Sequence, residues 1–118
     1  MENTTAVCLV LTTWPVASPV EPFVRALVET RLAACVHLCE PGRSTYRWEG
    51  AVEEAVERQL VIKTTRDRVA AIEARLREAH PYDLPEFLVC DAAGGRAYAA
   101  WIRASVAEPE AGADPRVS

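Results

Sequence analysis

A chain of 118 residues, half of them hydrophobic, has room for one globular domain with one core. Its formal net charge is −4, and no segment gathers Lys and Arg into a stripe, so the electrostatic footprint of a nucleic-acid-binding protein is missing. No stretch approaches the ~20 consecutive apolar residues that a membrane-spanning helix needs. These properties favour a single domain that binds neither nucleic acid nor membrane.

The N-terminal part of the chain predicts one strand after a short extension over residues 1–6. Branched residues are concentrated from Val7 to Thr13, a pattern typical of a buried strand. No basic residue occurs before Arg25, so this apolar run lacks the charged flank of a secretory signal. We therefore expect a cytoplasmic protein.

The residues that follow predict a first helix. Ser18 is the expected N-cap, with Pro19 at the first helical position and Glu21 closing a capping box. Apolar residues then recur at helical spacing and form a stripe: Phe23, Val24, Leu27, Val28 and Leu32.

The middle of the chain predicts a long hairpin. A second strand is expected from Cys35 to Cys39 and continues past Pro41-Gly42 to Trp48. The Glu49-Gly50 step turns the chain, and a third strand returns over residues 51–63.

A second helix and a stiff connector come next. Asp67 is the expected N-cap, and the apolar stripe is Val69, Ile72, Leu76 and Ala79. The connector 80–86 reads His-Pro-Tyr-Asp-Leu-Pro-Glu. Because proline fixes its own φ and biases the preceding residue toward extended backbone, His80 should end the helix in a fixed position.

The last elements complete a recognisable order. A fourth strand is expected from Phe87 to Cys90, and a short helix follows the Gly94-Gly95 turn, with Tyr98, Trp101 and Ile102 on its apolar face. The α+β order β-α-β-β-α-β, with an extra C-terminal helix and a long hairpin between the second and third strands, predicts a ferredoxin-like sandwich over residues 7–106. Residues 107–118 predict a disordered tail.

The predicted sheet has a face without a cover. Both helices of a ferredoxin-like sandwich lie on one face, yet the strands are apolar on both alternating faces. An exposed apolar face of several hundred Å2 marks an association surface, so we expect other subunits to cover it.

A first candidate site lies on the second strand. Cys35, His37 and Cys39 share one strand face at intervals of about 6.6 Å, and two thiols with an imidazole suit a soft transition metal. The alternative is a structural role, because cysteine is among the residue types most often buried. The chain has no C-x-x-C pair, and reduced thiols are expected.

A second candidate site combines the hairpin with the connector. Tyr46 and Trp48 share one strand face and could form a ligand pocket between subunits, with Glu49 among its polar groups. The alternative is that these aromatics anchor a subunit interface. His80 could hold a metal ion with a carboxylate of a neighbour, or could serve only as a cation at the end of a helix.

Five separated motifs of this chain occur together in a characteristic order and spacing. They are Leu32 to Val36, Tyr46 to Gly50, Lys63-Thr64, His80 to Glu86, and Tyr98 with Trp101. In this series the chain resembles the CutA family of divalent-cation tolerance proteins from Val7 to Ser105. The resemblance implies a homotrimer, in which hairpins such as 36–63 reach across to neighbours, and a non-enzymatic role in tolerance of divalent cations such as copper.

The resemblance also indicates which metal ligands this chain lacks. Some CutA proteins are thought to bind copper through a cysteine late in the first strand and paired histidines before the Pro-Tyr step. Here those positions hold Leu11, Ala79 and His80, so one of the three ligands is present. We expect no required cofactor and at most weak binding of copper or another divalent ion. The alternative function is a small-ligand sensor like the trimeric PII signalling proteins.

Overall fold

One antiparallel sheet and three α-helices make up the structure, a computed structural model that describes residues 6–108. The elements are β1 (Ala6–Pro15), α1 (Glu21–Glu29), β2 (Cys35–Leu38), β3 (Gly42–Trp48), β4 (Ala51–Thr64), the 3-10 helix η1 (Arg66–Arg68), α2 (Val69–Ala79), β5 (Leu88–Ala93) and α3 (Arg96–Val106). The first five residues, and the predicted tail from residue 109 on, lie outside the described residues.

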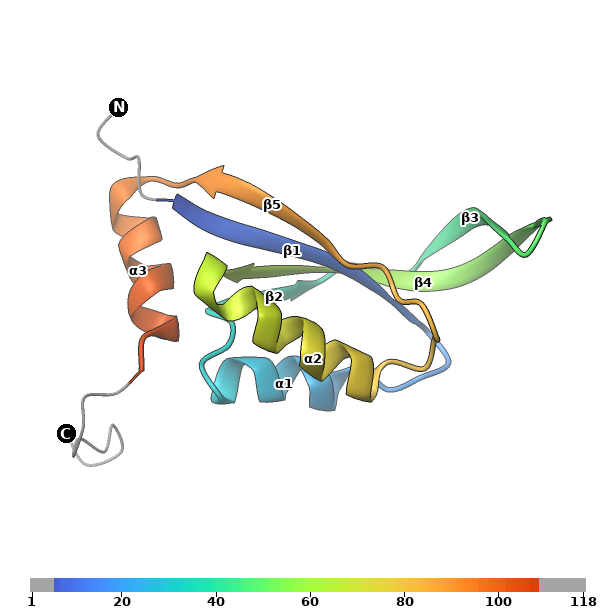
Figure 1. Cartoon of the computed structure of the whole chain (residues 1–118), viewed down its shortest axis with the longest axis horizontal. Helices are drawn as coiled ribbons and strands as arrows, with labels where there is room; N and C mark the ends of the chain where they lie inside the picture. The colour runs from blue at the N-terminus through green and yellow to red at the C-terminus, as the bar shows by residue number, and fades with distance from the viewer. Residues whose placement is uncertain (1–5, 109–118) are drawn as a thin grey trace.

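The topology confirms the predicted ferredoxin-like sandwich. The strand order is β2-β4-β1-β5, and β3 also pairs with β4. Helices α1 and α2 lie side by side against one face of the sheet, whereas α3 stands across one end of it (Figure 1). The β3–β4 hairpin projects from the opposite end, which gives the chain a long dimension of 52 Å.

The main core lies between the sheet and helices α1 and α2. Alternate residues of β4 point to this face, so Leu60 and Ile62 are fully buried beside Val10 of β1. The helices contribute the residues that recur at helical spacing, of which Leu27, Ile72 and Leu76 are the most deeply buried.

The other sheet face has no cover over most of its area. Leu11 of β1 pairs with Val61 of β4 on one side and with Leu88 of β5 on the other, which places three apolar side chains in one row. Helix α3 packs only at the end of this face, where Ala99 and Ile102 contact Val7. We call the remaining uncovered surface, with Leu88 54% exposed, the open face.

The hairpin contains a register change that the sequence-based prediction did not include. Strands β2 and β3 form one predicted strand, but the structure interrupts it at residues 39–41. Leu38 pairs with Leu60 and Gly42 pairs with Glu57, so four steps on one strand oppose three on the other. The extra residue is a β-bulge, and Pro41, which has no N–H to donate, lies within it.

The predicted start of the first helix was wrong. Helix α1 begins at Glu21, its N-cap is Val20, and no side chain caps it. The Ser18 N–H instead donates to the Pro15 carbonyl in a turn, which leaves the predicted capping box unformed. Pro22 then lies in the first turn of the helix, where a missing N–H costs nothing.

The predicted apolar stripes were correct in their centres and wrong at their ends. Val28 is 43% exposed on the outer side of α1, and Ala79 is exposed at the end of α2. Leu32 is buried but lies beyond α1, because Arg31 adopts a φ of 63° and the Leu32 N–H bonds back to Leu27.

Two further predictions required correction. Asp67 does not cap α2; it accepts a hydrogen bond from the Thr65 hydroxyl, and the 3-10 turn η1 precedes the helix instead. On α3, Tyr98 and Trp101 are 47% and 46% exposed, whereas Ile102 is buried as predicted. The two exposed rings contact each other, with centroids 5.4 Å apart.

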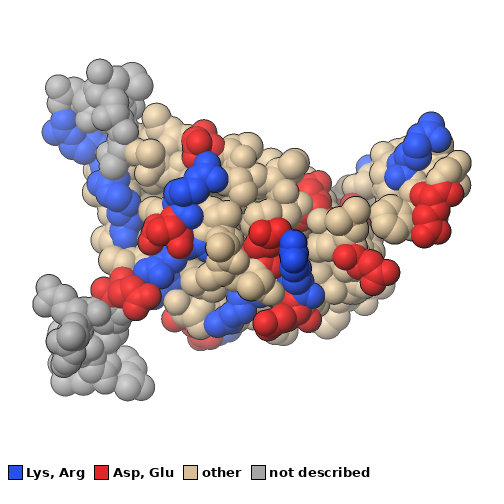
Figure 2. All heavy atoms as spheres, in the orientation of Figure 1, with Lys and Arg blue, Asp and Glu red and all other residues tan. Residues whose placement is uncertain are grey.

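Charges are distributed without a dominant sign on the surface that faces the viewer in Figure 2. Acidic and basic side chains are interspersed over the helices, and one i,i+4 ion pair lies on each of α1 and α2. None of the described helices has the length and the apolar character to cross a membrane.

Adjacent residues of α1 provide a test of the core. Leu27→Ala removes a fully buried side chain and should lower the free energy of unfolding by about 2–5 kcal/mol. Val28→Ala changes the exposed neighbour and should stay within about 0.5 kcal/mol. Urea denaturation at one protein concentration measures both. Equal effects would contradict the assignment of Val28 to the outer side of the helix.

Candidate functional site

His80 ends helix α2 as predicted, in extended backbone with φ −75° and ψ 138°. The following Pro81 disfavours helical backbone at this position, and the His80 N–H still closes the last turn by donating to Leu76 at 2.8 Å. The side chain turns inward and is only 8% exposed. The backbone of His80 is therefore restrained on both sides, by the hydrogen bond of its N–H to Leu76 and by the following proline.

Both nitrogens of the imidazole have backbone partners. The Tyr82 N–H donates to Nδ1 at 3.0 Å, so Nδ1 carries the lone pair. Nε2 then carries the proton and donates to the Thr13 carbonyl oxygen at 2.7 Å. Burial lowers the pKa of His80, against smaller raising effects of the Thr13 hydrogen bond and the charge of Glu57, which favours this neutral form.

Aromatic rings pack against both sides of the histidine at tilted angles. Its ring centroid lies 4.6 Å from that of Trp14 and 4.9 Å from that of Tyr82, and Trp14 in turn stacks on Phe23 of α1. This row of ring contacts joins the helix layer to the connector. His80 thus fixes where Tyr82 lies.

Tyr82 in turn forms a hydrogen bond with an acidic residue of β4. Its hydroxyl donates to Glu57 at 2.8 Å, and Glu57 is buried at 7% exposure. Burial and this hydrogen bond raise the pKa of Tyr82 to about 12, so the phenol stays protonated and remains a donor. The carboxylate is hydrogen-bonded here by a neutral group.

A second carboxylate is fixed in the same way at the end of the connector. The Gln59 amide donates to Glu86 at 2.8 Å and also to the Thr12 carbonyl at 2.8 Å. Both donors of one amide are used, so the Glu86 side chain is tied to the end of β1.

A cavity of about 870 Å3 lies between the hairpin and the connector. Connector residues 81–86 form one wall, and the hairpin contributes Ser44, Thr45, Tyr46, Trp48 and Glu57, with Thr13 between them. The two segments that the sequence singled out therefore meet across one cavity. The sequence predicted a cleft between subunits, and here a single chain supplies both sides.

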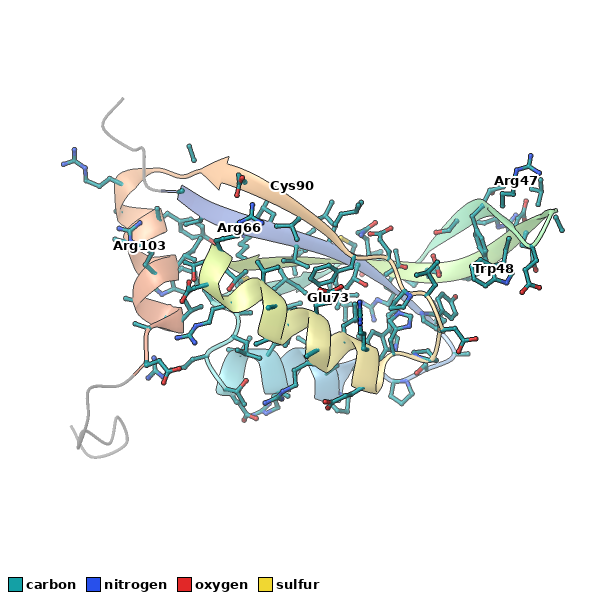
Figure 3. All side chains as sticks on the ribbon, in the orientation of Figure 1. Arg47, Trp48, Arg66, Glu73, Cys90 and Arg103 are labelled. Atoms are coloured by element: carbon teal, nitrogen blue, oxygen red, sulfur yellow. The ribbon has the colours of Figure 1, made fainter. Side chains whose placement is uncertain are left out.

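The hairpin aromatics share the face that was predicted for them. Tyr46 pairs with Glu53 and Trp48 with Ala51, so both rings lie on the same face of the hairpin as Glu57. Trp48 and Arg47 project to opposite sides of the hairpin (Figure 3). Glu49, a predicted ligand-binding residue, is not among the cavity-lining residues; it adopts φ 50° in the turn next to Gly50, at φ 81°.

The residues present do not fit a metal ion at His80 within one chain. A ligand nitrogen needs a free lone pair, and here Nδ1 accepts a hydrogen bond while Nε2 donates one. No three His, Cys, Asp or Glu side chains of residues 6–108 are grouped as a metal site would require. Metal binding by His80 stays a prediction from the sequence, and both ring hydrogen bonds weigh against it.

Two of the three residues of the strand cluster are placed as the alternation predicted. Cys35 pairs with Lys63 and His37 with Val61, so their side chains belong to the open face, and Cys39 follows at the bulge. All four cysteines are free, and His37 is exposed. Metal binding by Cys35, His37 and Cys39 likewise stays a prediction.

Sequence reasoning missed three residues of this site. Glu57, Gln59 and Thr13 reach the connector only through the pairing of β1 with β4, in which Thr13 opposes Gln59. The one signal available was two polar residues, Glu57 and Gln59, at alternate positions just before the apolar run of a strand.

The model of the CutA1 divalent ion tolerance protein family matches residues 8–105. The divalent-cation tolerance protein CutA of Pectobacterium atrosepticum is 40% identical over 99 residues, which cover 83% of this chain and 90% of that protein. The crystal structure of CutA from Xylella fastidiosa has a TM-score of 0.81 at 40% identity, covering 86% of this chain and 98% of that one. The apo structure of a PII-like protein CutA from a Nostoc species has a TM-score of 0.77 at 33% identity, covering 85% and 97%.

The neutral state of His80 predicts a pH dependence of stability. Its pKa in the folded chain lies below the ordinary value of 6.5, so between these two values the unfolded chain binds more protons. The contribution of this ring to stability is complete above a pH of about 6.5 and is lost as the pH falls through that window. Urea unfolding at about pH 7 and about pH 5 should therefore give a lower free energy at the lower pH.

Two substitutions separate this effect from other titrating groups. His80→Gln keeps a donor for Thr13 but does not titrate, and should reduce the loss of stability at low pH. His37→Gln removes the other histidine of the chain, which is exposed in the single chain, and serves as the comparison. The same pH dependence in both variants would exclude His80 as its source.

Proposed function

This chain belongs to the CutA1 divalent ion tolerance family, and from that membership we propose that it serves divalent-cation tolerance as a non-enzymatic homotrimer in the cytoplasm. The observation that carries the proposal is the match of the family model over residues 8–105, nearly the whole described chain. The four free cysteines are in keeping with a reducing compartment.

The open face supports the assembly. Leu11, Val61 and Leu88 form an apolar row that α1 and α2 cannot reach, because both lie on the other side of the sheet. Burial of such a surface between identical chains would remove it from water. Association would also stabilise a small domain whose own core is limited in size.

We propose a non-enzymatic role because His80, the residue that the sequence offers as a general base, is not available to a substrate. A general base needs an accessible nitrogen within reach of a substrate proton, whereas this ring is buried and bonded to backbone at both nitrogens. Its role in the proposal is to position the connector. No resident metal is needed for that role.

A second candidate function is that of a PII-like small-ligand sensor. The observation that favours it is the cavity of about 870 Å3, which lies in the range of small-molecule sites and far exceeds the volume of one ion. A ligand there would contact the connector and the hairpin at once. Its binding could therefore change how the projecting hairpin is held.

The solution mass tests the proposed assembly. Wild type should sediment at three times the 12.9 kDa of one chain at micromolar concentration. Leu88→Glu places a charge on the open face, at a position exposed in the single chain, and should reduce the mass toward that of one chain. Val28→Glu, on the outer side of α1, is the matched control and should not change it. A wild-type monomer would overturn the proposed trimer.

Copper titration tests how the tolerance role is carried out. We expect weak binding, with the same affinity in wild type and His80→Ala, because the ring offers no free lone pair. The double variant Cys35→Ser with Cys39→Ser tests the strand cluster in the same calorimetric experiment. Tight binding that His80→Ala abolishes would show that the ring leaves its backbone partners, and would favour the sequence-based assignment of His80 as a ligand.

A further inference from the structure

The cavity between hairpin and connector is acidic without a compensating base. Its lining includes Glu57, Asp83 and Glu86 and no Lys or Arg. Glu57 and Glu86 each accept a hydrogen bond at Oε2, from a phenol and from an amide, and neither donor adds positive charge. None of the ion pairs formed by the described residues includes any of the three. A cavity of this kind concentrates negative potential.

The remaining walls are apolar and aromatic. Tyr46 and Trp48 face the cavity from the hairpin, and Tyr82 faces it from the connector beside Leu84 and two prolines. The π faces of tyrosine and tryptophan attract cations, and they also provide apolar contact area. The cavity therefore presents both features that recognise a positively charged organic group.

The spacing of the carboxylates favours an organic cation over a metal ion as the ligand of this cavity. No three acidic, His or Cys side chains within residues 6–108 come close enough together to hold one ion. The same carboxylates are distributed around a volume of about 870 Å3, which suits a molecule of many atoms. Anionic ligands such as nucleotides would meet three carboxylates and no basic side chain.

We propose that this cavity binds an organic cation, a molecule with an ammonium group on an aromatic or apolar body. The ammonium group lies toward Glu57, and the body lies against Tyr46 and Trp48. This inference rests on the proposed small-ligand role of the same cavity and specifies the charge and the chemical class of its ligand.

Three indole probes that differ in charge test the proposal by calorimetry on the full chain. Tryptamine carries an ammonium group, tryptophol is its neutral alcohol, and indole-3-propionate is an anion. We expect saturable binding of tryptamine, binding of tryptophol weaker by about tenfold, and weaker binding still of the anion. Equal binding of amine and alcohol, preference for the anion, or no binding of any probe would overturn the proposal.

Substitutions assign the binding to the cavity. Glu57→Gln keeps an oxygen that can accept the Tyr82 hydroxyl, and should weaken tryptamine binding by about tenfold while leaving tryptophol unchanged. Glu54→Gln, in the same hairpin but outside the cavity and paired with Arg43, should change neither. Asp83→Asn, an exposed connector position, provides a second variant if Glu57→Gln does not fold. Equal effects of the substitutions at positions 54 and 57 would contradict the assignment.

Failure of this inference can be told apart from failure of the proposed assembly. The same preparations are sedimented before titration, so a trimer that binds no amine overturns only the ligand class. A monomeric wild type overturns the assembly, whatever it binds. Binding by Leu88→Glu but not by wild type would indicate that a second copy occupies the cavity, and would overturn the inference as well.

Discussion

The position of one buried imidazole determines how the two halves of this site meet. His80 joins the Thr13 carbonyl at the end of β1 to the Tyr82 N–H in the connector, across 67 residues of sequence in the first case and two in the second. These hydrogen bonds require opposite protonation at the two nitrogens, so only one neutral tautomer satisfies both. Tyr82, Glu57 and the cavity wall take their places from that ring. In the single chain, the side chain that the sequence offers as a metal ligand links β1 to the connector.

The sheet itself separates two kinds of surface. On one face, α1 and α2 complete a core that needs nothing from outside the chain. On the other, apolar side chains remain uncovered except where α3 packs over Val7. Because the β3–β4 hairpin projects beyond both layers, Tyr46 and Trp48 lie outside the core and line the cavity opposite the connector. One wall of the cavity is therefore formed by residues that the core does not include.

The order of the elements and the placement of the motifs could be predicted from the sequence because they depend on local patterns. Alternation in β4, helical spacing around Leu27 and Leu76, and the two prolines of the connector each act within a few residues. The helix starts could not be predicted, since Ser18 and Asp67 satisfy local turns as readily as helix caps. The partners of His80 and Glu57 could not be predicted either, because they are set by strand register and not by spacing along the chain.

The bulge at residues 39–41 reverses the alternation of side chains along this part of the chain. Leu38 pairs with Leu60 and lies on the core face, whereas Tyr46 pairs with Glu53 and lies on the face of Glu57. In a regular strand two residues at this even spacing would share one face, and the extra residue places them on opposite faces. One continuous stretch of chain therefore supplies an apolar residue to the core and aromatic residues to the cavity, although the parity of the sequence positions does not change between them.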